Sequence, residues 1–280
     1  MTRAMHALVD GTPVETVPID DRGLQYGHGM FETCRVINER IPLWQFHAAR
    51  LSATAARLHI PLDVAAVDAE ARALAGKHSD AVLKILVTAG QGGRGYRSDA
   101  MTPRRIVSVL SAPVETVDRN IGATARLCQM RLAVQPMLAG LKHLNRLEQV
   151  LARAEWNDAS VAEGLMCDVD GRLVEGTMTN LFLVRDGRIV TPDLSRCGVA
   201  GVMRRVLLEL RPGIDTPIEM RDVTVEELDE ADECFLTNAV IGIWPVARIL
   251  DRDSARLRPG RIARSIMNAL EARFGFPRSQ

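Results

Sequence analysis

Lysine is scarce in this sequence, so its few positions are the places where an amine could take part in chemistry. The chain of 280 residues carries three lysines, Lys77, Lys84 and Lys142. A lysine amine forms imines with carbonyl groups and transfers protons when its pKa is lowered. The apolar pattern predicts a helix from Leu144, and the unpaired amides at a helix start disfavour a positive charge beside them. We therefore expect a lowered pKa for Lys142.

The other two lysines have simpler interpretations. Lys77 lies in the polar turn 76–79, where a solvated charge is expected. Lys84 lies within the apolar run 82–86, where it either has a function or extends its stem along apolar surface to reach solvent. On these residues alone a structural role for Lys142 also stays open.

A glycine pattern suggests a different chemistry. Residues 90–95 fit Gly-x-Gly-x-x-Gly after a predicted strand, and Glu115 follows at the distance expected of a dinucleotide-binding acid. That fingerprint requires a helix whose start holds the pyrophosphate, but residues 96–104 lack an apolar period and contain Pro103. A glycine-rich hairpin or binding loop is therefore favoured, and a nicotinamide dehydrogenase is the alternative.

The composition of the chain indicates which classes of binding partner to expect. Lys plus Arg and Asp plus Glu both number 35, so no net charge attracts nucleic acid or an anionic membrane, and a small-molecule substrate is expected. The five cysteines are scattered without a Cys-x-x-Cys pair, which predicts neither a disulfide framework nor a metal site and fits the cytoplasm. No signal peptide and no membrane-spanning run is predicted.

The hydrophobic pattern predicts helices and strands mixed along the whole chain. Turn signals at Asp10-Gly11 and 38–40 predict two hairpins, and four short strands between 164 and 190 predict a meander. Periodicity is lost around Pro113, so we expect domains at 1–112 and 121–280 joined by a linker at 113–120. The predicted helices are 44–58, 68–75, 144–156, 202–210 and 263–274, and the main further strands are 81–88, 105–110, 123–134 and 233–236.

The run AGLKHLNRLEQV at 139–150 resembles the cofactor-lysine segment of class IV aminotransferase-like enzymes, which use pyridoxal 5'-phosphate. Four further segments are similar in the same order, namely DRGLQYGHGMFET at 21–33, HAARL at 47–51, GGRGY at 92–96 and EGTMTNLF at 175–182. An acidic residue is common in the family where His28 stands here. The resemblance implies a two-domain α/β protein of fold-type IV, with the cofactor in the interdomain cleft of a homodimer.

The resemblance also implies a role for individual residues. Lys142 would attach the cofactor and move protons, Arg50 would bind the phosphate, and Glu175 would keep the ring nitrogen protonated. Further cofactor contacts would come from the helix start at Val202 and Met203 and from Thr237 and Asn238. Arg94 and Tyr96 would bind the substrate, and Thr33 would donate a proton. His143 is expected to pack against the helix start.

Two reactions are compatible with these residues. The GGRGY loop, Thr33 and the long lysine segment favour the family's lyases, in which an enolpyruvyl group leaves as pyruvate and the remaining ring becomes an aromatic amine. The alternative is a transaminase acting on a D-amino acid, a branched-chain amino acid or an amine. A cofactor-binding protein without catalysis is a third possibility.

Overall fold

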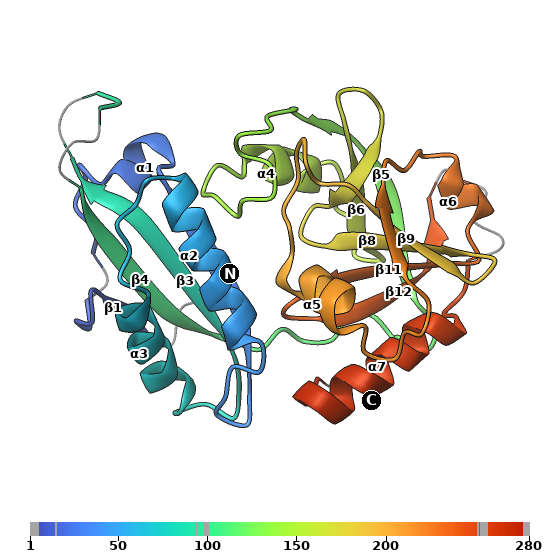
Figure 1. Cartoon of the computed structure of the whole chain (residues 1–280), viewed down its shortest axis with the longest axis horizontal. Coiled ribbons are helices and arrows are strands. Elements are labelled where there is room, and N and C mark those ends of the chain that lie inside the picture. The colour runs from blue at the N-terminus through green and yellow to red at the C-terminus, as the bar shows by residue number, and fades with distance from the viewer. Residues whose placement is uncertain are drawn as a thin grey trace. The chain divides into compact units, whose positions relative to one another are not determined.

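The protein forms two compact units, seen in the computed structural model of Figure 1, which describes residues 6–14, 16–92, 95–97, 101–250, 252 and 257–276. Unit 1 comprises Met1–Val114 together with Leu141–Asn145, and unit 2 comprises Glu115–Gly140 and Arg146–Gln280. Helices and strands are mixed in both units, as expected for the predicted α/β class. The predicted domain limits stay a prediction.

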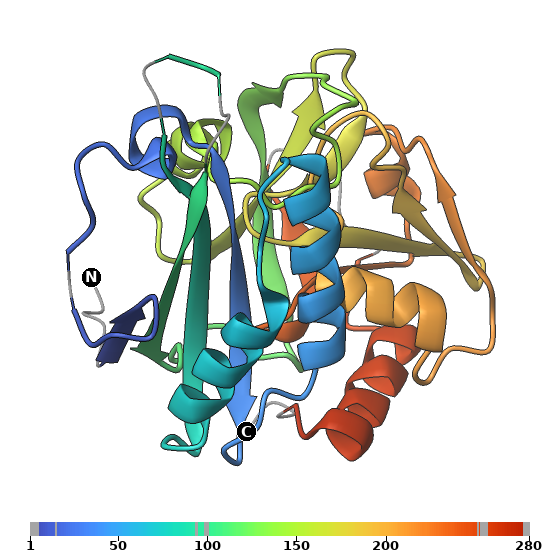
Figure 2. The same ribbon diagram turned by 60° about the vertical axis from the view of Figure 1, so that its left-hand side comes forward.

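Unit 1 is a four-stranded antiparallel sheet with helices packed on it. The strand order is β1-β4-β3-β2, so β2 is an edge strand. Figure 2 shows helices α2 and α3 side by side on this sheet. The elements are β1 (His6–Val9), α1 (Arg22–Tyr26), β2 (Gly29–Ile37), α2 (Trp44–Arg57), α3 (Val64–Ala75), β3 (Asp80–Gln91) and β4 (Thr102–Ser111).

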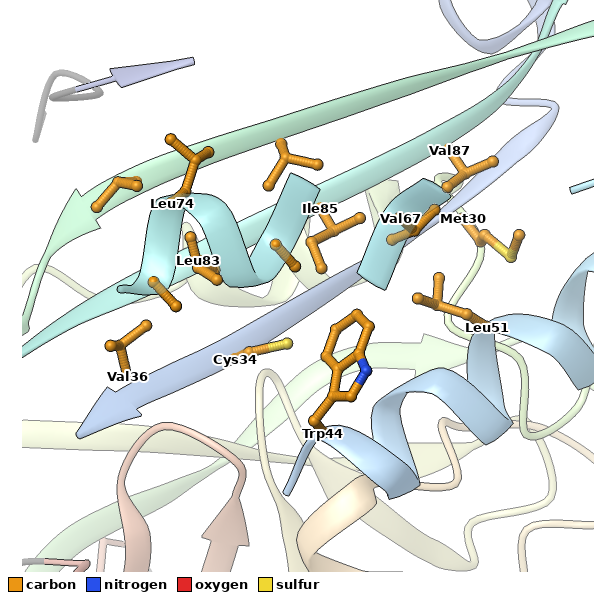
Figure 3. Close-up of a cluster of buried hydrophobic side chains, with 14 of the residues drawn as sticks. Met30, Cys34, Val36, Trp44, Leu51, Val67, Leu74, Leu83, Ile85 and Val87 are labelled. Carbon is orange, nitrogen blue, oxygen red and sulfur yellow. The ribbon is translucent and has the colours of Figure 1, made fainter. Parts of the chain in front are cut away.

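The core of unit 1 lies between the sheet and these helices (Figure 3). Alternation along the strands sends Cys34, Leu83 and Ile85 toward the helices, where Trp44 and Leu51 of α2 meet them. Phe31, Thr33 and Lys84 occupy the alternate positions of β2 and β3. Their side chains therefore lie on the opposite face of the sheet.

Unit 2 is built on an eight-stranded sheet of order β10-β9-β8-β11-β12-β5-β6-β7. Four of the seven neighbouring pairs are antiparallel, whereas β5 is parallel to both β12 and β6, and β10 is parallel to β9. The C-terminal helix α7, labelled in Figure 1, packs on β12 and β11. The elements are β5 (Ala123–Leu132), α4 (Leu147–Arg153), β6 (Val161–Asp168), β7 (Leu173–Gly176), β8 (Asn180–Arg185), β9 (Arg188–Pro192), α5 (Val202–Leu210), β10 (Ile218–Arg221), α6 (Glu227–Glu230), β11 (Glu233–Asn238), β12 (Gly242–Ile249) and α7 (Arg261–Phe274).

The strongly periodic elements are confirmed, whereas several pairings were predicted wrongly. Helices α2 and α5 lie where expected. The meander is wrong, because β7 pairs with β6 at one edge of the sheet while β8 pairs with β11 and β9. Neither hairpin forms as a two-stranded ribbon: the first turn makes one bridge, from Val9 to Thr12, and β1 pairs with β4 instead. Local turn signals cannot identify a partner strand so distant in sequence.

None of the helices in the described ranges combines the length and the apolar composition needed to cross a membrane.

Candidate active site

The segment that carries Lys142 is held along the edge of β2 by backbone hydrogen bonds. The amide of Phe31 donates to the carbonyl of Lys142 at 3.0 Å, and the amide of Leu144 donates to the carbonyl of Gly29 at 3.0 Å. Helix α4 begins only at Leu147, so the predicted helix start at 144 is wrong. These strand-like hydrogen bonds use the backbone groups that a helix would need. Lys142 therefore does not stand at the mouth of a helix, and the predicted effect of a helix dipole on its amine is wrong.

An aromatic ring provides the surroundings of the Lys142 amine instead. The Nζ atom lies 4.3 Å from the centroid of Phe31, within the range of a cation–π contact. The backbone of its neighbour His143 forms a bridge with Met30 of β2. The amine of Lys84 approaches the same ring, at 5.8 Å from the centroid.

Glu32 organises a buried charge cluster on the helix-facing side of β2. Its carboxylate accepts hydrogen bonds from Nδ1 of His47 and Nε of Arg50, both at 2.7 Å, and also from Nη2 of Arg50. The side chain of Glu32 is 1% exposed and that of Arg50 is 13% exposed. The role implied for Arg50 thus depends on the Glu32 carboxylate, because Glu32 binds both Arg50 and His47 of the helix that carries it.

The pKa values of Glu32 and His47 in this cluster are both lowered, for different reasons. Burial by itself would raise the pKa of Glu32, but Arg50 and His47 outweigh it and lower this pKa to about 2. Burial lowers the pKa of His47, and the positive charges of Arg50 and Lys142 act in the same direction against Glu32. At neutral pH the cluster is therefore an ionised Glu32 between a neutral His47 and a charged Arg50. Sequence reasoning missed Glu32 and His47, although both stand in the matched segments.

Thr33 and Tyr96 lie in different surroundings within unit 1. Thr33 is half-buried in β2, directly opposite Lys84 of β3. Tyr96 is 87% exposed, and its ring meets Tyr26 edge-on with 5.5 Å between centroids. Arg94, the other predicted substrate contact, lies outside the described residues.

The buried side chain of Arg22 holds the backbone beside Tyr96. Its guanidinium donates to the carbonyls of Gly95 at 2.9 Å and Tyr96 at 3.0 Å. It also donates to Nδ1 of His28 at 3.4 Å, while Nε2 of His28 donates to the carbonyl of Leu58 at 3.0 Å. His28 therefore links Arg22 to the end of α2. A single buried cation fixes this part of the glycine-rich segment.

In unit 2, Glu175 and α5 are tied together by short hydrogen bonds. Glu175 stands in β7, and its Oε2 accepts from the amide of Val199 at 2.8 Å. Asn180 donates to the carbonyl of Val199 at 2.8 Å and accepts from the amide of Gly201 at 3.0 Å. A Cβ atom at residue 201 would come within 2.0 Å of Oδ1 of Asn180, so a larger residue would displace the Asn180 side chain from its present position. These contacts fix the chain immediately before Val202.

The start of α5 has the features of an anion site. No side chain caps this helix at Gly201, and the side chains of Val202 and Met203 are buried, so these two residues offer backbone amides. Thr237 and Asn238 contribute differently. Thr237 donates to the carbonyl of Gly242 at 2.8 Å, and Asn238 accepts from the amide of Val240 at 2.8 Å. Their side chains shape the turn between β11 and β12.

Glu163 is a buried residue that sequence reasoning missed. Its carboxylate lies under the turn between Glu175 and Asn180 and accepts from the hydroxyls of Thr177 at 2.6 Å and Thr179 at 2.9 Å. Burial raises its pKa, and the hydrogen bonds from the turn oppose that effect. A glutamate among the mostly apolar residues of strand β6 was the available signal. Its position indicates that it orients the turn after Glu175.

Other features of the described chain do not form a competing site. A pocket of about 620 Å³ in unit 2 is lined by β8, β9 and β10, but it contains none of the predicted site residues. Most of its charged rim is internally paired, as Arg221 bonds Glu227 at 2.6 Å. No group of three or more potential metal ligands occurs among the residues that the structure describes.

The chain is similar to known proteins over most of its length. The chain is 48% identical to the crystal structure of 4-amino-4-deoxychorismate lyase from Pseudomonas aeruginosa, with a TM-score of 0.88 over 95% of this chain and 98% of that one. It is 38% identical over 244 residues to aminodeoxychorismate lyase from Vibrio harveyi, covering 86% of this chain and 90% of the relative.

A more distant structure shares the fold. A hypothetical aminotransferase from Mycobacterium tuberculosis, solved in its PLP-bound form, is 17% identical and has a TM-score of 0.82 over 96% of this chain and 98% of that one. The family model described as amino-transferase class IV matches residues 29–249. With most of its length matched by that model and by relatives above 30% identity, the chain belongs to the amino-transferase class IV family.

Proposed function

We propose that this protein is a pyridoxal-phosphate-dependent lyase that converts aminodeoxychorismate to p-aminobenzoate and pyruvate. Similarity over nearly the whole chain to two lyases of this name supports the reaction. The observation that carries the proposal is the fixed position of Lys142 on β2, in the unit that also holds Arg50 in a buried ion pair.

The residues present fit pyridoxal phosphate. Unit 1 offers the amine of Lys142 for covalent attachment and the guanidinium of Arg50 for the phosphate. Unit 2 offers the uncapped amides of Val202 and Met203, which suit a phosphate group, and the carboxylate of Glu175, which suits a protonated ring nitrogen. The donor set thus matches the anionic and the basic ends of the cofactor.

When bound, pyridoxal phosphate withdraws electrons from the carbon that bears the substrate's amino group. The protein then has to move protons. The Lys142 amine removes the proton from that carbon, and Glu175 keeps the ring nitrogen protonated. Thr33 donates a proton to the methylene carbon of the departing enolpyruvyl group. The hydrogen bond from the amide of Val199 holds the Glu175 carboxylate in place while Glu175 keeps the ring nitrogen protonated.

A transaminase is the second candidate, because the family as a whole is described as amino-transferases. Such an enzyme would use Lys142, Arg50 and Glu175 in the same way. It would need no proton donor for an enolpyruvyl group, so the role of Thr33 separates the two reactions.

We also infer a homodimer in the cytoplasm. Helix α4 presents Leu147, Val150 and Leu151 on one face, and they are 67%, 60% and 49% exposed. A second copy of the chain is the partner that would cover this face. All five cysteines are buried thiols, which fits a reducing compartment. Sedimentation of wild type as a dimer and of Leu151→Glu as a monomer would support the assembly, and a monomeric wild type would refute it.

The function is tested by mixing the cofactor-loaded protein with aminodeoxychorismate. We expect pyruvate and p-aminobenzoate in equal amounts, measured by lactate dehydrogenase coupling and by fluorescence. Lys77→Ala is the matched control and should behave as wild type. Transfer of an amino group to 2-oxoglutarate without pyruvate release would establish the transaminase instead, and neither product would refute both.

A further inference from the structure

The pocket of unit 2 is separate from the residues of the proposed reaction. Its volume is about 620 Å³, which lies in the size range of small-molecule sites. Its lining comes from strands β8, β9 and β10, from Glu227 of α6 and from Ala231. None of these residues has a role in the proposed reaction. A ligand in this pocket would therefore occupy a second site.

The floor of the pocket is apolar. Leu183 of β8 is directly opposite Val190 of β9, and Ala231 belongs to the same buried cluster. All three are at most 8% exposed. Alternation along the two strands puts Arg185 and Arg188 on the same face as this floor. The organic part of a ligand would pack on the floor and on the aliphatic stems of these arginines.

Two arginines stand opposite each other at the edge of this floor. Arg185 of β8 is paired in register with Arg188 of β9, and the turn 186–187 joins their strands. Directly opposed residues of like charge destabilise a sheet. Arg185 forms ion pairs with Glu230 and Asp186. The guanidinium of Arg188 forms no ion pair or hydrogen bond with the described part of the chain, so an anion beside it would compensate its charge.

The carboxylates of the rim limit the charge of that anion. Asp186, Glu219 and Glu227 line the same pocket. Arg221 binds Glu227 at 2.6 Å and lies 3.6 Å from Glu219, so the charge of Arg221 is already compensated. The acids would repel a polyanion such as a polyphosphate. A single carboxylate on Arg188 suits this rim better, and a guanidinium plane also stacks on aromatic rings.

We propose that this pocket binds a small aromatic carboxylate. Its carboxylate group would lie between Arg185 and Arg188, where the Arg188 fork donates two parallel hydrogen bonds to it. Its ring would pack on Leu183 and Val190 at the floor. The ligand thus supplies the negative charge that the opposed arginines lack and covers the apolar surface below them.

Titration calorimetry of the cofactor-loaded protein with benzoate tests the site. Arg188→Gln keeps a polar side chain and removes its charge. We expect this variant to bind benzoate roughly tenfold more weakly than wild type, as for loss of charged hydrogen bonds. Arg40→Gln is the matched control, because Arg40 is also an exposed arginine but does not line the pocket. Its affinity for benzoate should equal that of wild type.

Two further ligands test the chemical class. Benzamide has the ring without the charge, and inorganic phosphate has a charge without the ring. We expect neither to show binding that depends on Arg188. Phosphate binding that Arg188→Gln weakens as much as benzoate binding would contradict an aromatic carboxylate. Benzoate bound only at the reaction site would have equal affinity for wild type and Arg188→Gln, and that result or an absence of benzoate binding would overturn the proposal.

Turnover separates this site from the proposed function. Without benzoate, Arg188→Gln should convert aminodeoxychorismate at the wild-type rate, because Arg188 has no part in the reaction. Slower turnover by this variant would place the pocket in the reaction site and overturn a second site. If wild type forms no pyruvate, the proposed function fails, and the benzoate titrations still decide whether the pocket binds its ligand.

Discussion

The amine of Lys142 lies 4.3 Å from the centre of the Phe31 ring because the backbone on either side of that lysine is bonded to the edge of β2. The lysine is therefore positioned by strand pairing with the N-terminal half of the chain. It shares a unit with Arg50, whose orientation depends on Glu32 of the same strand. Two of the charged groups that the proposed chemistry needs, Lys142 and Arg50, are thus arranged around one strand.

Arg50→Ala should weaken cofactor binding and also destabilise the protein. The substitution removes the phosphate contact and leaves Glu32 buried without its main counterion, which should cost about 3 kcal/mol of unfolding free energy. Cofactor titration and urea denaturation measure the two effects. Arg72→Ala, which breaks an exposed pair with Asp68, is the control and should change neither. An unchanged cofactor affinity in Arg50→Ala would contradict the phosphate role.

Glu32 should make stability depend on acidic pH. Its pKa is about 2 in the folded protein against 4.5 in the reference state, so its contribution is complete above about 4.5 and is lost as the pH falls toward 2. The lowered pKa of His47 adds a loss that begins below its reference value of 6.5. As the pH falls toward 2, the free energy of unfolding should decrease by about 3 kcal/mol less in Glu32→Gln than in wild type. Parallel stability curves for wild type and variant between pH 5 and 3 would rule this out.

Glu175→Gln should keep the cofactor bound and slow turnover. A glutamine oxygen can still accept the amide of Val199, so the loop before α5 should stay in place. A neutral amide cannot hold the ring nitrogen protonated, and we expect kcat to fall by ~10²-fold or more with little change in KM. Steady-state kinetics with aminodeoxychorismate measure this. Wild-type kcat in the variant would refute the assignment.

Thr33→Val removes the proposed donor hydroxyl and keeps the shape of the side chain. We expect pyruvate release to slow by ~10²-fold, as is typical for loss of a general acid. Because the substitution leaves Lys142 and Arg50 untouched, the visible absorption of the bound cofactor should not change. Rapid-mixing experiments with a single turnover make the measurement. Pyruvate release at the wild-type rate would assign the proton to Lys142 or water.

The sequence predicted those features that depend on local pattern. The apolar period predicted helix α2, which carries Arg50, and the matched segments led to the roles of Arg50, Glu175 and Lys142. The surroundings of Lys142 were predicted wrongly, because its pairing with β2 joins residues distant in the sequence, and periodicity carries no information on such a partner. The proximity of Lys84 to Thr33 depends on strand register, which was likewise inaccessible.

Identification of the lysine that carries the cofactor tests the account most directly. The cofactor-loaded protein is reduced with borohydride, digested with trypsin and analysed by mass spectrometry. Trypsin does not cut at a modified lysine, so the cofactor on Lys142 gives peptide 132–146 and the cofactor on Lys84 gives peptide 78–94. The account predicts the reduced cofactor on peptide 132–146, at Lys142, and unmodified Lys84. Modification of Lys84, or a protein that retains no cofactor after reduction, would contradict it.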